Sequence, residues 1–118
     1  MINININPEL EKGFKNFTVD KKNIPIQFRR YTGKETTYLE YYTWSTKAEE
    51  FANDLPVNWG IYGTIDLYSK NNYKNILNEV LDKLIEIGFT VTDVGQDDYE
   101  DDTQYYHVPI NFYKEGGN

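Results

Sequence analysis

Few side chains in this sequence could carry a covalent reaction. The only histidine is His107, the only serines are Ser45 and Ser69, and cysteine is absent. A general base needs a nucleophile or an orienting acid beside it, and this supply is poor. His107 alternates with apolar and aromatic residues, which favours a histidine on a strand surface, hydrogen-bonded to a neighbour, over a catalytic one. We therefore predict no catalytic residue and no enzyme activity.

An acidic run at residues 97–102 is the second chemical feature. Carboxylate oxygens could gather a hard cation such as Ca²⁺, but the run lacks the ligand spacing and turn glycine of a calcium loop. It favours a solvated hairpin loop whose like charges repel one another. No metal, cofactor or Gly-rich phosphate loop is predicted. The five carboxylates belong to Asp97, Asp98, Glu100, Asp101 and Asp102.

Tyrosine is the most informative side chain, with eleven copies. It combines a rigid apolar body with a polar tip and is enriched in protein interfaces. Strand propensity alone also places tyrosine on exposed strands, but the aromatic content of 16% favours a protein interface. The tyrosines expected on the strand faces opposite the helix are Tyr31, Tyr62, Tyr68, Tyr105 and Tyr113.

Bulk properties narrow the class of protein. A chain of 118 residues fits one domain, and we expect residues 1–118 to form it. The net charge of −7 disfavours binding of a phosphate backbone. The N-terminus lacks the features of a signal peptide, and no apolar run approaches the roughly 20 residues that span a bilayer. The cytoplasm is the expected compartment, without membrane insertion.

Two helices should position these residues. Leu10, Phe14 and Phe17 lie on one stripe of a short helix over residues 8–17. A longer amphipathic helix is predicted over residues 72–87, begun by Asn71 or Asn72 and ended by Gly88. Its apolar stripe contains Ile76, Leu77, Val80, Leu81, Leu84 and Ile85.

Strands should fill most of the remaining chain, with a long loop at residues 45–59 and a frayed tail at residues 114–118. The predicted fold class is α+β: a mostly antiparallel sheet of about five strands, with one long amphipathic helix packed on one face and a short N-terminal helix. The predicted strands cover residues 24–31, 36–44, 60–69, 89–94 and 104–113.

Several short motifs lie within or between these elements. They are Ile24-Pro25-Ile26, Tyr38-Leu39-Glu40-Tyr41, Ala52-Asn53-Asp54, Ile65-Asp66-Leu67-Tyr68-Ser69, Gly88-Phe89, Tyr99-Glu100-Asp101-Asp102-Thr103, Tyr106-His107 and Phe112. In this order they resemble the tail-completion, or tail-terminator, proteins of long-tailed bacteriophages and prophages. The resemblance spans most of the chain, and the motif at residues 99–107 is its most specific part.

This resemblance implies a structural protein without cofactor that forms a hexameric ring on the head-proximal end of the tail tube. The ring would stop tube growth and join the tube to the head connector while DNA passes without specific binding. The protein would assemble in the host cytoplasm and remain in the virion tail. The 97–102 loop would line the lumen. Candidate subunit contacts are Tyr38, Trp44, Phe51, Trp59, Tyr62 and Tyr68.

Two other functions remain open at this stage. The same fold could serve as another neck or minor-tail connector of a phage. A free regulatory or inhibitor protein could instead use the acidic loop to mimic nucleic acid and bind a basic partner.

Overall fold

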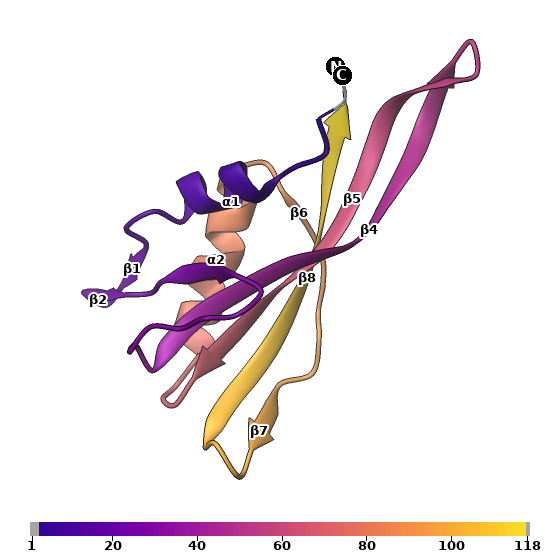
Figure 1. The fold of residues 1–118 in the computed structure, drawn as a ribbon. Coiled ribbons are helices and arrows are strands. Elements are labelled where there is room, and N and C mark those ends of the chain that lie inside the picture. Colours follow the sequence, from indigo (N-terminus) through magenta and orange to yellow (C-terminus); the bar gives the residue numbers. More distant parts are fainter. Residues whose placement is uncertain (1–2, 118) are drawn as a thin grey trace.

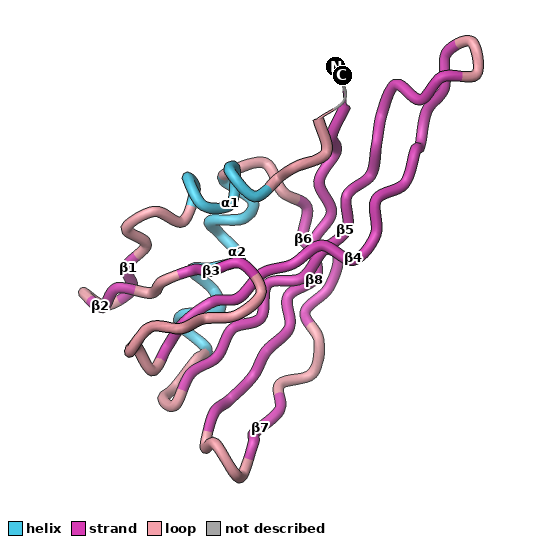
Figure 2. Tube along the Cα trace, viewed as in Figure 1, coloured by secondary structure: helices cyan, strands magenta, loops and turns pink. Residues whose placement is uncertain are grey.

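The computed structural model describes residues 3–117 and arranges most of them in one large twisted sheet (Figures 1 and 2). The sheet order is β3-β4-β5-β8-β6, and β7 also pairs with β8. Only the β3–β4 pair is parallel among the strand pairs of this sheet. The elements are α1 (Asn7–Gly13), β1 (Thr18–Val19), β2 (Lys22–Asn23), β3 (Ile26–Phe28), β4 (Thr37–Ala52), β5 (Leu55–Ser69), α2 (Lys74–Glu86), β6 (Thr90–Val94), β7 (Asp98–Glu100) and β8 (Tyr105–Gly117).

The predicted α+β class is wrong, because the described chain is mostly β. The helices α1 and α2 contain 7 and 13 residues, whereas β4, β5 and β8 contain 16, 15 and 13. The large sheet of residues 3–117 has six strands instead of about five, and it is mixed because the β3–β4 pair is parallel. The long amphipathic helix expected over residues 72–87 is the shorter α2. The strand content is higher than predicted because strands continue beyond their predicted ends.

The largest extension lies at residues 45–59, where a loop was predicted. There β4 and β5 continue as an antiparallel hairpin that pairs down to Ala52 and Leu55. The turn residues Asn53 and Asp54 have positive φ angles of 52° and 63°, which Asn and Asp tolerate in tight hairpin turns. Register shifts near Ser45 and Glu50 interrupt the period-two alternation, so the sequence pattern did not show a strand there.

Helix α2 ends at the predicted glycine, but its N-cap position is Tyr73 and not Asn71 or Asn72. The Asn72 side chain accepts a hydrogen bond from the backbone N–H of Lys74 at 3.1 Å. Gly88 has a φ of +93°, and the N–H of the next residue, Phe89, donates to the carbonyl of Leu84 at 2.9 Å. This left-handed glycine closure is a common helix stop. One predicted stripe residue, Ile85, is 63% exposed.

Helix α1 ends at Gly13, earlier than the predicted boundary of residue 17. A Cβ at Gly13 would lie 2.7 Å from Cδ1 of Ile87, so the glycine permits close approach to the end of α2. Phe14 and Phe17 nevertheless remain buried and contact each other edge to face at 5.1 Å.

The hydrophobic core lies between the two helices and one face of the sheet (Figure 1). Alternate residues of β5 and β8 supply its floor, as the period-two pattern predicts for β5. Residues 114–117, predicted as a frayed tail, continue β8 and pair with β5, while Asn118 lies outside the described residues. Neither helix in residues 3–117 combines the length and the apolar content required to cross a bilayer. The floor residues are Ile61, Ile65, Leu67, Val108, Ile110 and Phe112.

Candidate protein interface

A row of stacked rings crosses the sheet on the face opposite the helices. Tyr38 of β4, Tyr68 of β5 and His107 of β8 are register neighbours, so their side chains stand side by side. The centroid of the Tyr68 ring is 5.1 Å from that of Tyr38 and 4.5 Å from that of His107. Tyr31 extends the row, stacking on Tyr38 at 4.4 Å. The row includes two of the tyrosines predicted on this face, Tyr31 and Tyr68, with Tyr38 stacked between them.

His107 also holds β8 to β5 through Asp66. The ring Nε2 lies 2.8 Å from Oδ1 of Asp66, whose side chain is largely buried. This hydrogen bond and the charge of Asp66 raise the pKa of His107 above its ordinary value, because the carboxylate stabilises the imidazolium. The prediction of a strand-surface histidine bonded to a neighbour is confirmed. The bond to Asp66 gives this histidine a structural role between β5 and β8.

The phenols of Tyr38 and Tyr68 stay neutral through the physiological pH range, because the pKa of each is raised. Burial, with a smaller contribution from the charge of Glu40, raises the pKa of Tyr38 to about 12. Burial, followed by the charge of Asp66, raises the pKa of Tyr68 as well. Glu40 also accepts a hydrogen bond from the backbone N–H of Tyr31 at 2.7 Å. This face of the sheet therefore presents the neutral hydroxyls of Tyr38 and Tyr68 near the carboxylates of Glu40 and Asp66.

A second aromatic cluster lies where the β4–β5 hairpin leaves the sheet. Tyr62 and Tyr113 both donate to the carboxylate of Glu49, at 3.2 and 2.6 Å. The exposed Trp44 ring lies 5.7 Å from the ring of Tyr62, and its Nε1 donates to Thr64 at 3.0 Å. This arrangement brings together two predicted contact residues, Trp44 and Tyr62.

The outer half of the hairpin forms an arm, which we define as residues 48–57. Pairing of β5 with β8 ends at Asn58, so the arm consists of β4 and β5 alone. Figure 1 shows the arm projecting away from the rest of the sheet. Phe51 and Leu55 near its tip are 63% and 67% exposed. Leu55 was missed from the sequence because it stands in a predicted loop.

Trp59 lies at the base of the arm. Its indole N–H is buried and has no hydrogen-bond acceptor in the part of the chain that the structure describes. A buried indole donor usually finds a partner. The structure places Trp59 apart from the Trp44 and Tyr62 contact, with Gly116 of β8 as its register partner.

The acidic run is more ordered than a free loop. Residues 98–100 form β7, which pairs with β8, and only the following residues turn. Asp97 accepts a hydrogen bond from the hydroxyl of Tyr73, while Glu100 accepts one from Thr103 at 2.8 Å. Within residues 3–117, no group of three or more histidine or acidic side chains is arranged to hold a metal ion.

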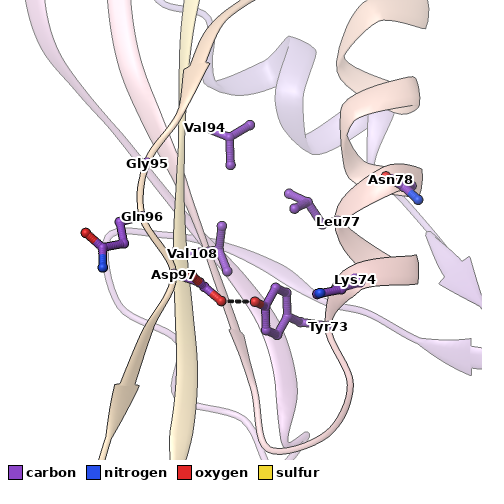
Figure 3. A pocket seen from close by; sticks show the side chains of 9 residues that line it. All are labelled: Tyr73, Lys74, Leu77, Asn78, Val94, Gly95, Gln96, Asp97 and Val108. Atoms are coloured by element: carbon purple, nitrogen blue, oxygen red, sulfur yellow. Dashed lines mark hydrogen bonds between the residues drawn. The ribbon is translucent and has the colours of Figure 1, made fainter.

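Two grooves of similar size flank the core. The first, of about 500 Å³, lies between α2 and the segment that joins β6 to β7 (Figure 3). Apolar side chains of Leu77, Val94 and Val108 line it, and the bond between Tyr73 and Asp97 closes its lower end in this view.

The second groove, of about 530 Å³, lies beside β3 at the opposite edge of the sheet. Apolar side chains, the carboxylate of Glu11 and the ammonium of Lys15 line it together; the apolar residues are Phe14, Ile24, Ile26 and Phe28. Phe28 is 42% exposed. This groove was not predicted, because the parallel pairing of β3 that forms it depends on a connection through residues 29–36.

Comparison with known proteins finds neither a protein-family model nor a curated protein that matches this chain.

Proposed function

We propose that this chain is a phage tail terminator, a structural subunit whose copies form a ring that caps the tail tube and joins it to the head. The projecting arm is the observation that carries the proposal. Two large apolar side chains, Phe51 and Leu55, are about two-thirds exposed near the tip of an element whose strands pair only with each other. Exposed apolar side chains on a projecting element are typical of surfaces that become buried in an assembly.

The aromatic face supports the same function. Tyrosine rings that are ordered by stacking lose little side-chain entropy when a partner covers them. The stacked row and the Trp44–Tyr62 cluster together offer rigid contact area on one side of the sheet. Both aromatic surfaces suit a subunit that functions by contacting other protein subunits.

The motifs behind the family resemblance also converge in space. Asp66 and His107, which come from two separate motifs, share a hydrogen bond at 2.8 Å. Ser69, at the end of the same β5 motif, is bonded to Thr37 at 3.0 Å, immediately before the motif that begins at Tyr38. Two separate hydrogen bonds, one on each face of β5, therefore involve side chains from these motifs.

Capping follows from ring geometry. A subunit whose contact surfaces differ on its two sides binds head to tail, and such contacts close into a ring when their rotation divides the circle. One face of the ring would match the last ring of the tube, and the other face would offer no surface for growth but would receive the head connector. The proposed hexamer would let DNA pass, in the host cytoplasm during assembly and then in the virion tail.

Deletion of the gene in its parent phage or prophage tests this function. Electron microscopy should show overlong tails that lack heads, because nothing ends tube polymerisation. Tails of normal length without heads would instead identify another neck connector. Normal, infectious particles would reject a virion role and leave the free acidic regulator, for which a stable complex with a basic partner protein is the direct test.

A further inference from the structure

Two β-bulges in β4 bring a large aromatic side chain and a carboxylate to the same face of the sheet. The β4–β5 register skips one residue of β4 at each bulge, and the skipped residues are Trp44 and Glu49. The Trp44 ring packs against Tyr62, and Glu49 accepts a hydrogen bond from the same tyrosine. A bulge re-aims the extra side chain, and bulges are common beside functional sites.

Gly60 leaves room for the carboxylate of Glu49. A Cβ at Gly60 would lie 2.6 Å from each of the two carboxylate oxygens, so these oxygens rest directly over the glycine. They accept hydrogen bonds from the hydroxyls of Tyr62 and Tyr113, at 3.2 and 2.6 Å. The bond to Glu49, followed by burial and by the charges of Glu49 and Glu115, raises the pKa of Tyr113 to about 12. This phenol therefore remains a donor, and a second carboxylate lies close to it.

Aromatic rings surround this carboxylate, and the four side chains that form what we call the bulge cluster are Trp44, Tyr62, Tyr113 and Glu49. The centroid of the Tyr62 ring lies 5.7 Å from that of Trp44 and 5.1 Å from that of Tyr113. Trp44 is 55% exposed, and the bond from its indole N–H to Thr64 fixes the ring. Ring faces attract ammonium and guanidinium groups, and a carboxylate that accepts two bonds keeps lone pairs for a further donor.

The chain itself places one cation at the cluster. The ammonium of Lys47 lies 5.3 Å from the centre of the Tyr62 ring. Lys47 is exposed, and within residues 3–117 neither Lys47 nor Glu49 takes part in an ion pair. An exposed lysine held by one weak contact is displaced at little cost. Lys47 therefore shows that the cluster accepts a cation, and it competes for the position without closing it.

We propose that the bulge cluster is a binding site for an arginine side chain of a partner protein. The guanidinium stacks on the exposed ring of Trp44 while its N–H groups donate to Glu49. Arginine fits better than lysine, because its planar group can stack and donate at the same time. The site is a property of the single chain and goes beyond the proposed function. Only the identification of the partner as a tail protein rests on that function.

Titration of the purified protein with N-acetyl-arginine methylamide, followed by NMR of the indole N–H groups, tests the site. The signal of Trp44 should shift saturably, with a dissociation constant on the order of 1–10 mM for one exposed side chain. Trp59 is the internal reference, because its indole N–H is buried. The citrulline analogue has nearly the same shape without the charge and should shift Trp44 little. An equal response to both probes, or no saturable shift of Trp44, overturns the proposal.

Three variants assign the binding to the named groups. Glu49→Gln keeps the size and removes the charge, so it should weaken binding of the arginine probe by about fivefold or more. Lys47→Met removes the competing cation and should strengthen binding by about threefold. Asp82→Asn makes the same charge change as Glu49→Gln on the exposed face of α2 and is the matched control. Unchanged affinity in Glu49→Gln, or weaker binding in Lys47→Met, would contradict the assignment.

The cation site and the tail function fail separately. The titration uses the isolated protein, so a negative result rejects the cation site and leaves the tail function to the gene deletion. If the arginine probe binds as expected but the deletion yields normal, infectious particles, the cation site stands and its partner lies outside the virion.

Discussion

At the residue scale, His107 links the aromatic face to the interior of the sheet. Its ring stacks on Tyr68 while its Nε2 is bonded to the largely buried Asp66. The protonated histidine is the form that this carboxylate favours. The folded-state pKa therefore lies above the ordinary value of about 6.5. Part of the stability of the fold should depend on pH.

We predict that His107→Gln destabilises the protein mainly at low pH. With a raised folded-state pKa, the contribution of the pair is complete below the unfolded-state pKa and is lost as pH rises through the folded-state value. The variant should lose about 1–2 kcal/mol of unfolding free energy at pH 5.5, and less at pH 8.5. Urea unfolding at both values measures this. Equal losses at both pH values would contradict the charged pair.

A second residue-scale prediction concerns Gly63 in the middle of β5. A Cβ there would lie 2.5 Å from both Cζ of Phe112 and the backbone carbonyl of Tyr42. Neither the buried ring nor the backbone can yield easily, so Gly63→Ala should cost about 1–3 kcal/mol in urea unfolding. Gly60→Ala is the control, because its Cβ meets the flexible side chain of Glu49. A larger loss at Gly60 would refute this packing argument.

At the element scale, the sequence predicted elements whose pattern is local and missed those that depend on pairing. Alternation located the centre of β5, and Asn72 and Gly88 located the ends of α2. The strands of the arm were missed because bulges near Ser45 shift the register, and a bulge is a property of two strands. The same limit applies to the site. Composition indicated aromatic contacts, but the stacking of Tyr38 on Tyr68 follows from cross-strand register.

The arm should be the least protected part of the long hairpin. An isolated two-stranded ribbon is marginally stable in water, whereas residues 61–68 lie between β4 and β8. In hydrogen exchange followed by mass spectrometry, peptides from residues 48–57 of the monomer should exchange much faster than those from residues 61–68. Assembly should slow the arm selectively. Equal protection of both segments in the monomer would show that the arm is stabilised in another way.

At the scale of the whole molecule, the separation of charge has two consequences. In the proposed ring, the basic N-terminal region, residues 1–34, and the acidic tip of the arm, residues 49–54, would favour one head-to-tail orientation of neighbouring subunits. The remaining carboxylates, which include the 97–102 run, leave residues 35–118 strongly acidic. In a ring, an acidic surface on the lumen would repel DNA and ease its passage, because exposed charges act over a screening distance of roughly 8 Å.

Replacement of Asp98 and Asp101 by lysine tests the lumen assignment. Asp97 is left intact because it accepts the hydrogen bond from Tyr73. If the loop faces the lumen, rings of this variant should retain DNA threaded through them, and retention should fall steeply between 50 and 200 mM salt, on the order of the counterion-release effect. The variant Glu79→Lys/Asp82→Lys makes the same charge change on the exposed face of α2. Equal retention by both variants would place the acidic loop outside the lumen, since net charge alone would then explain the binding.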